Sequence, residues 1–118
     1  MSGRRARTLR VVVVGGSDQG RQTIDVLRAG GAHVVVAVVD PAMAPGTTVA
    51  ELPVVGMDEL DRLGVEGFVA AVGDNAARAG VVARIRAERP ELELVSAVHP
   101  AAVVAADAIV GAGATLMA

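Results

Sequence analysis

The chain has 118 residues and a formal net charge of −2 at pH 7, and 53% of its residues are hydrophobic and 20% charged. This composition is typical of one globular domain, excludes a disordered chain, and contains no apolar run near the roughly 20 residues that span a bilayer. Cysteine is absent and Phe68 is the sole aromatic residue, which excludes disulfides, thiolate nucleophiles, cysteine zinc sites and base-stacking surfaces for nucleic acid.

Residues 1–8 form a basic segment that we expect to be a solvated tail, because the valines after it are too few for the apolar region of a secretory signal. We therefore expect a cytoplasmic protein with no membrane partner. The net charge of −2 and the single aromatic residue predict no nucleic-acid partner. The four valines at 11–14 form an unbroken apolar run. Such a run is typical of a parallel strand that is buried on both faces.

A glycine-rich turn follows this strand and leads into a helical pattern. Gly15 and Gly16 permit backbone angles that other residues avoid, and a helix is predicted from Gly20 to just before the glycine pair at 30–31. The N–H groups and the dipole of this helix point into the turn, where we expect phosphate. The dinucleotide-binding pattern G-x-G-x-x-G is met in part, because Ser17 replaces its second glycine. Tight packing without a ligand is the alternative.

A second valine-rich strand is predicted at 33–39, directly before Asp40. Asp40 follows Gly20 by twenty residues, about where an acidic side chain meets a ribose hydroxyl in dinucleotide-binding folds. The alternative role for Asp40 is that of a turn residue before Pro41. His33 begins the strand at the edge opposite the expected site, so we expect it to be structural.

The later segments continue this alternation of strands and helices. We expect a loop at 41–49 that is able to close over a ligand, an edge strand at 53–55 and a brief helix at 59–63 capped by Asp58. A buried strand at 68–72, a helix at 75–88 capped by Asp74 or Asn75, and a last strand at 92–98 would follow. Val81, Val82 and Ile85 would form the inner face of the second long helix. The fold class is therefore α/β, with a small Rossmann-like parallel sheet of about five strands.

The strand number bears on the ligand. A full dinucleotide fold uses six strands, so about five favour a mononucleotide or a sugar nucleotide over NAD. We expect the ligand at the carboxyl ends of the first strand and the 68–72 strand, with Gly73 and Asn75 facing the turn of residues 15–20. Helix capping alone is the alternative role for residues 73–75.

After residue 97 the pattern changes to a period of six. Aliphatic residues recur every six positions, at Val98, Val104, Val110 and Leu116. Alanine lies four positions after each of the first three, at Ala102, Ala108 and Ala114. One large and one small residue in every six is typical of a β-solenoid. A loosely packed tail is the alternative. We predict one coil of three hexads at 98–115, and domains at 9–97 and 98–118 with the second incomplete.

Four stretches, VVGGSDQGR, AVGDNAAR, VHPAAVV and IVGAGAT, together resemble the sugar acyltransferases related to sialic acid O-acetyltransferase. They also resemble the N-acetyltransferases that act on UDP-linked 4-amino sugars. The resemblance covers residues 9–118. It implies a Rossmann-like domain that holds a sugar nucleotide, then a left-handed β-helix of hexapeptide repeats. It also implies homotrimers, with acetyl-CoA bound between neighbouring subunits outside this stretch.

The resemblance also implies roles for individual residues. It implies that Asp40 approaches the uridine end of a UDP-linked sugar and that Gly73 and Asn75 line the opposite wall. It also implies that the residues of the turn cradle the phosphates, namely Gly15, Gly16, Ser17, Asp18, Gln19 and Gly20. Many members have His at the position of Gln19, and glutamine carries no proton at neutral pH. The general-base His of the family lies in later coils, and His99 matches the entry to the β-helix instead. We therefore expect no catalytic residue and no metal site here, and binding without turnover by this stretch alone.

Two other functions stay open at this point. The chain could be a non-catalytic module that senses a nucleotide or NAD(H) and regulates a partner. It could also be a degenerate remnant that binds no ligand and only supports assembly. A preference for NADH over UDP-sugars would select the first of these.

Overall fold

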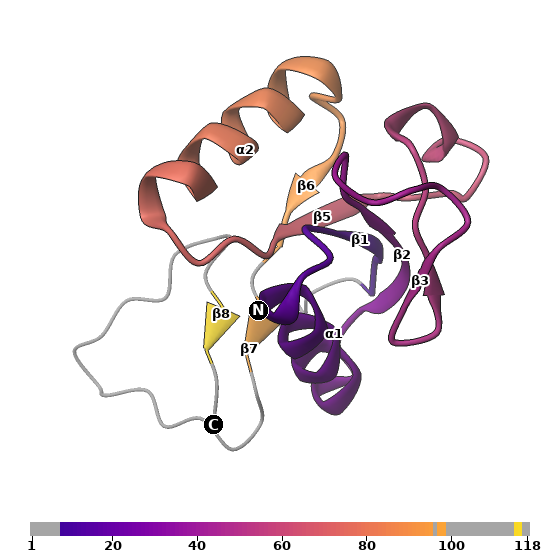
Figure 1. Ribbon diagram of the computed structural model, residues 1–118, viewed down its shortest axis with the longest axis vertical. Coiled ribbons are helices and arrows are strands. Elements are labelled where there is room, and N and C mark those ends of the chain that lie inside the picture. Colours follow the sequence, from indigo (N-terminus) through magenta and orange to yellow (C-terminus); the bar gives the residue numbers. More distant parts are fainter. Residues whose placement is uncertain (1–7, 96, 99–114, 117–118) are drawn as a thin grey trace, which may run out of the picture.

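The computed structural model describes residues 8–95, 97–98 and 115–116. Within these residues, the centre is a four-stranded parallel sheet, in the order β2 (Val34–Val39), β1 (Arg10–Val14), β5 (Gly67–Ala70) and β6 (Glu93–Leu94). The helices α1 (Asp18–Gly30) and α2 (Asn75–Glu88) cover opposite faces of this sheet (Figure 1). The predicted α/β, Rossmann-like class is confirmed, with four strands in the sheet instead of about five.

The valines of β1 supply the core on both faces of the sheet. Their side chains are at most 6% exposed. Val11 and Val13 pack in one cluster with Ile24 of α1, whereas the valines between and after them pack in a second cluster with Ile85 of α2. Because successive side chains of a strand point to opposite faces, an unbroken apolar run is what a strand between two helices requires.

The first crossover follows the prediction closely. The predicted stop at the glycine pair is confirmed: Gly31 has a φ of 68°, and its N–H donates to the Leu27 carbonyl at 3.1 Å. The start differs, because α1 begins at Asp18, two residues before Gly20. Gly20 therefore lies inside the first helical turn. At the start of β2, His33 Nδ1 accepts a hydrogen bond from the Leu9 N–H at 3.1 Å, which agrees with a structural role.

The segment between β2 and β5 departs most from expectation. The predicted loop at 41–49 ends in β3 (Thr48–Val49), which forms an antiparallel hairpin with β4 (Leu52–Pro53). The predicted edge strand at 53–55 is wrong in its bounds, since only Val54 bridges to β2. The turn at residues 50–51 brings β4 back onto β3, which leaves Val54 to bridge to β2.

The predicted helix at 59–63 with Asp58 as its cap is also wrong. A 3₁₀ helix, η1 (Met57–Glu59), begins after Gly56 instead. The N–H of Gly56 donates to the carboxylate of Glu59 at 3.2 Å, so the acceptor comes from within the helix, three residues further along the chain.

The second long helix and its cap are confirmed. The carboxylate of Asp74 accepts a hydrogen bond from the Ala77 N–H at 2.9 Å. Ile85 is buried on the inner face, and Val81 and Val82 are half-buried against the same cluster. Neither helix, nor any other helix in the described ranges, is long and apolar enough to cross a membrane.

The predicted last strand at 92–98 is divided between two sheets. β6 pairs with β5, whereas β7 (Ala97–Val98) pairs in parallel with β8 (Thr115–Leu116). Paired residues of β7 and β8 are eighteen positions apart, the length predicted for one coil of three hexads. The other hexad positions at 99–114 and residues 1–7 of the predicted basic tail at 1–8 lie outside the described residues. The six-residue pattern and the boundaries 9–97 and 98–118 stay predictions.

Candidate functional site

A cleft lies at the carboxyl ends of β1 and β5. The chain leaves β1 for β2 on one side and returns to β5 on the other, so this edge is a topological switch point, where open α/β sheets bind their ligands. The cavity has a volume of about 280 Å³ and is lined by Val14, Gly15, Ser17, Gln19, Asp40, Pro41, Ala71, Val72, Gly73, Val81 and Arg84. It occupies the predicted position.

Two glycines of the turn are required by close backbone contacts. Gly15 has a φ of 112°, and a Cβ on it would lie 2.7 Å from the carbonyl oxygen of Ala71 at the end of β5. A Cβ on Gly20 would lie 2.0 Å from the carbonyl oxygen of Gly15. The turn and the helix can approach each other this closely only without these side chains. The N-terminus of α1 is thereby held against the end of β1.

The start of α1 leaves N–H groups available to a ligand. Ser17 is the N-cap, but its hydroxyl makes no capping hydrogen bond. The first N–H groups of a helix have no acceptor inside the helix, and the dipole places partial positive charge there. The first turn of α1, beside Gln19 in the cleft wall, is thus suited to an anion.

The carboxylate of Asp40 accepts hydrogen bonds from backbone N–H groups of the turn after β1 and of the loop after β2. Its Oδ2 accepts a hydrogen bond from the Gly16 N–H at 2.8 Å, and its Oδ1 accepts one from the Ala42 N–H at 2.9 Å. The turn role considered for Asp40 is therefore confirmed, and its contact with a ribose stays a prediction. The N–H of Gly16 is engaged within the chain, so a phosphate would meet the first turn of α1 instead.

The structure brings together five of the nine predicted site residues. Gly15, Ser17, Gln19, Asp40 and Gly73 line the cleft. The other four lie elsewhere: Gly16 and Gly20 are buried behind the turn, Asp18 is exposed at the start of α1, and Asn75 lines a separate hollow.

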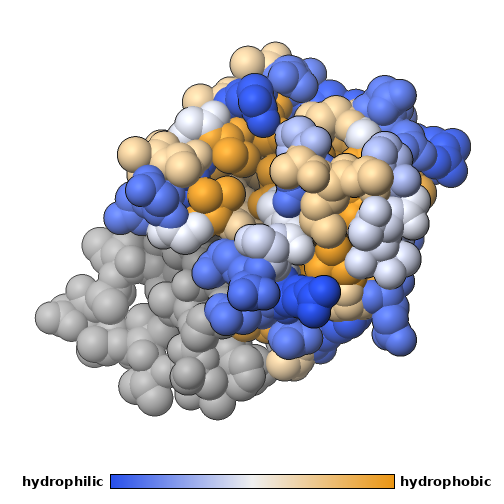
Figure 2. Space-filling view, in the orientation of Figure 1, coloured by the Kyte–Doolittle hydropathy of each residue, from blue (hydrophilic) through white to orange (hydrophobic). Residues whose placement is uncertain are grey.

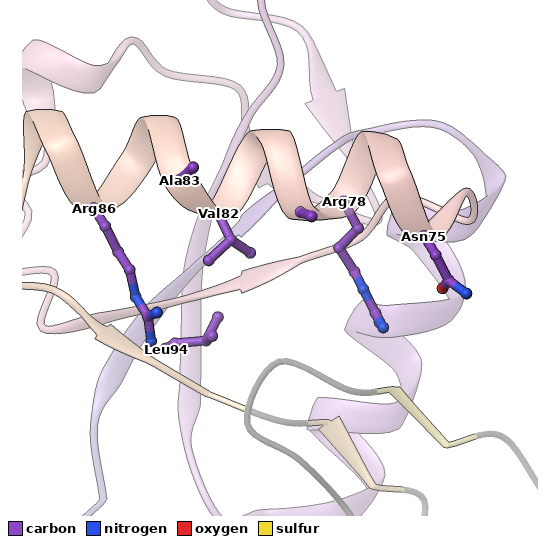
Figure 3. A pocket seen from close by; sticks show the side chains of 7 residues that line it. Asn75, Arg78, Val82, Ala83, Arg86 and Leu94 are labelled. Carbon is purple, nitrogen blue, oxygen red and sulfur yellow. The ribbon is translucent and has the colours of Figure 1, made fainter.

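The hollow that holds Asn75 lies between α2 and β6. It has a volume of about 390 Å³ and is lined by Asn75, Arg78, Ala79, Val82, Ala83, Arg86 and Leu94. Figure 3 shows the side chains of Asn75, Arg78 and Arg86 extending from the same side of α2. Asn75 thus belongs to a different surface from Gly15 and Gly73.

Two further cavities continue the cleft toward η1. One has a volume of about 240 Å³ and shares Val14, Pro41 and Arg84 with the cleft; the other has about 290 Å³ and shares Asp40 and Pro41 with it. Both are mainly apolar, and Figure 2 shows hydrophobic side chains at the surface between α2 and the sheet. The three cavities together form one depression, which we call the trough.

Arg84 is the main residue of this trough that the sequence analysis missed. It is exposed and has no ion-pair partner among the described residues. Its position three residues after Val81 was the available signal, because residues at that spacing share a helix face. An unpaired guanidinium beside the N-terminus of α1 adds a second source of positive charge for an anion.

Arg89 supports the far end of the trough. Its guanidinium donates to the Met57 carbonyl at 3.1 Å and also binds Asp61 and Glu91. The hydrogen bond with Glu91 raises the pKa of Arg89, and the same bond lowers the pKa of Glu91. Met57, which lines two of the three cavities, is fixed relative to α2 through this residue.

Within the described part of the chain, no three His, Cys, Asp or Glu side chains gather as a metal site would require. The polar groups of the trough are backbone N–H donors, the Ser17 hydroxyl, the Gln19 amide, the Arg84 guanidinium and the carboxylates of Asp40 and Glu88. This arrangement can bind and orient an anionic ligand that carries hydroxyl groups.

The sequence model of a protein family, the PglD N-terminal domain, matches residues 10–85 of this chain. The chain belongs to the PglD N-terminal domain family. In this PglD-type domain, the matched range contains the glycine turn, Asp40 and most of α2, and thus every lining residue of the trough except Glu88. No curated protein matches the chain.

Solved structures extend the likeness beyond the PglD-type domain. A mutant of perosamine N-acetyltransferase from Caulobacter crescentus, in complex with CoA and GDP-perosamine, has 35% sequence identity and a TM-score of 0.79 over 92% of this chain and 51% of its own. The acetyltransferase domain of PglB from Neisseria gonorrhoeae FA1090, in complex with acetyl coenzyme A, has 24% identity and a TM-score of 0.72, over 95% of this chain and 54% of its own, and shares the fold. The chain spans about half the length of these relatives. The predicted resemblance to sugar acyltransferases is confirmed.

Proposed function

We propose that this chain is the sugar-nucleotide-binding part of an acetyl-CoA-dependent sugar N-acetyltransferase. The observation that carries the proposal is the trough at the switch point between β1 and β5, in which Gly15, Gln19 and Arg84 stand beside the start of α1. The similarity to perosamine N-acetyltransferase, whose structure holds CoA and GDP-perosamine, supports the same ligand class here.

The chemistry of the trough fits the parts of a sugar nucleotide. The diphosphate would accept hydrogen bonds from the first turn of α1 and from Arg84, since both supply positive charge. Each carboxylate oxygen of Asp40 already accepts one hydrogen bond and has a further lone pair, so a ribose hydroxyl can donate to it. The apolar cavities beyond Pro41 would take the base.

The nucleotide is proposed to be guanosine diphosphate. The resemblance in the sequence led us to expect a UDP-linked sugar, whereas the relative with 35% identity was solved with a GDP-linked one. The sugar would carry a free amine, which attacks the carbonyl carbon of the acetyl thioester. A general base takes the amine proton, the C–S bond breaks, and the CoA thiolate leaves and receives that proton. No residue of the trough supplies that base in our proposal. The general base, the acetyl-CoA site and the trimer interface would belong to further coils of the β-helix. The eighteen-residue spacing between paired residues of β7 and β8 supports a first coil of this β-helix.

Isothermal titration of the full chain tests the proposal. GDP and a GDP-linked sugar should bind with measurable heat, and NADH should not. A preference for NADH would select the nucleotide-sensing module instead. If neither heat nor competition between ligands reveals binding of GDP, UDP, CMP or NADH, the assignment of the trough is wrong.

A further inference from the structure

One arm of the trough runs along α2 and ends at two charged residues. This arm is lined by Val14, Val39, Pro41, Met57, Arg84, Ile85 and Glu88. Five of these seven side chains are apolar, and the two charged ones lie on adjacent turns of one helix. A flat, apolar group with a polar edge would fill such a space with its edge toward Arg84 and Glu88.

The position of Glu88 is unfavourable for the helix itself. Glu88 is the last residue of α2, where the helix dipole places partial negative charge, so a carboxylate there is repelled. Arg84 precedes it by four residues, which is the weaker order for an ion pair within a helix. No guanidinium in the described ranges forms an ion pair with Glu88. The carboxylate is therefore exposed at the rim of the arm and available to an outside donor.

We propose that Glu88 is a specificity-determining residue that selects guanine as the base of the bound nucleotide. The inference rests on the proposed function, because it needs the diphosphate to lie at the start of α1. A carboxylate has two oxygens that only accept, and guanine offers two adjacent donors, N1–H and the N2 amino group, to such a pair.

Other bases match this edge less well. Uracil has one donor, N3–H, between two carbonyl oxygens, and those oxygens would be repelled by the carboxylate. Hypoxanthine keeps N1–H and O6 but lacks the N2 amino group, so it would form one of the two hydrogen bonds to Glu88. Inosine diphosphate therefore isolates the contact that distinguishes guanine from every other common base.

The test is isothermal titration of the full chain with GDP, inosine diphosphate and UDP, for the unsubstituted protein and for Glu88→Gln. The unsubstituted protein should bind GDP at least tenfold more tightly than inosine diphosphate or UDP. In Glu88→Gln the affinity for GDP should fall about tenfold and the ratio between GDP and inosine diphosphate should approach one. Glu93→Gln, which removes an exposed carboxylate of β6 outside the trough, should change neither value.

The outcomes separate this inference from the proposed function. Equal binding of GDP and inosine diphosphate by the unsubstituted protein would overturn the role of Glu88 while leaving nucleotide binding intact, and this comparison needs no variant to fold. An unchanged ratio in Glu88→Gln would overturn it as well. Absence of binding by all three nucleotides would overturn the proposed function instead.

Discussion

The carboxylate of Asp40 accepts a hydrogen bond of 2.8 Å from the backbone N–H of Gly16, across 24 residues of sequence. The same side chain also accepts from the Ala42 N–H. A Cβ on Gly16 would meet the sulfur of Met43 at 2.5 Å, so the loop after β2 lies directly against the turn after β1. Asp40 therefore joins the turn after β1 to the loop after β2, the two segments that meet at the trough.

Asp40→Ala should weaken both the fold and ligand binding. It leaves two N–H groups without their charged acceptor, which should lower the free energy of unfolding by about 1–3 kcal/mol. Urea unfolding and titration with GDP measure the two effects. Asp25→Ala removes an exposed carboxylate from α1 and should change stability by less than about 0.5 kcal/mol. Equal effects of the two substitutions would contradict the joining role of Asp40.

Arg84→Met should weaken the binding of GDP by about tenfold to a hundredfold, because a charge-assisted hydrogen bond to phosphate contributes about 1.5–3 kcal/mol. The loss should shrink as salt is added, since salt screens an exposed charge. Arg86→Met is the matched control: Arg86 lines the other hollow, beside Leu94, away from the trough (Figure 3). A similar loss of affinity in both variants would mean that general charge, and not the position of Arg84, governs binding.

Alanine substitutions at two helical glycines should act in opposite directions. The Cβ of Gly20→Ala would lie 2.0 Å from a backbone oxygen of Gly15, so this variant should lose about 1–3 kcal/mol or more of stability. Gly80 lies in α2 with nothing within 4 Å of an added Cβ. Gly80→Ala should gain about 0.5–1 kcal/mol, because alanine is the better helix former. Thermal unfolding compares them, and a gain in both would contradict the close packing of the turn.

Local signals predicted the elements of this fold that depend on neighbours in sequence. The valines of β1, the glycine stop after α1 and the cap at Asp74 each follow from residues within a few positions. A cleft lies at the predicted edge of the sheet for the same reason, because the turn at residues 15–20 is a local pattern.

Long-range geometry decided what the sequence could not predict. The bond between Asp40 and Gly16 exists because β1 and β2 are parallel neighbours that end at the same edge. We predicted that Asn75 lines the cleft because it is close to Gly73 in sequence. The first turn of α2 directs it instead into the hollow between α2 and β6. Arg84 was missed because arginine on a helix is usually solvated, and only the packing of α2 brings it to the trough.

The β3–β4 hairpin carries backbone strain that substitution should relieve. Ala50 and Glu51 form its two-residue turn with φ of 49° and 72°, the left-handed region that asparagine and glycine favour. Ala50→Asn combined with Glu51→Gly should raise the free energy of unfolding by about 1 kcal/mol. The bond from Arg28 to the Ala50 carbonyl, at 2.8 Å, involves the backbone and should persist. Urea unfolding measures the gain, and a loss of stability would show that the turn has another conformation.

Glu59 should make stability fall in acid. The Gly56 N–H, and after it the Arg62 side chain, lower the pKa of Glu59 below its ordinary value of 4.5. A carboxyl group with a lowered pKa in the folded state stabilises the fold above the unfolded value, and this contribution disappears as the pH falls through the folded value. The difference in urea midpoint between the unsubstituted protein and Glu59→Gln should thus be largest above pH 4.5 and should narrow below it. Arg62→Met should retain most of this dependence, because the Gly56 N–H is the larger cause; a difference that widens in acid would contradict the assignment.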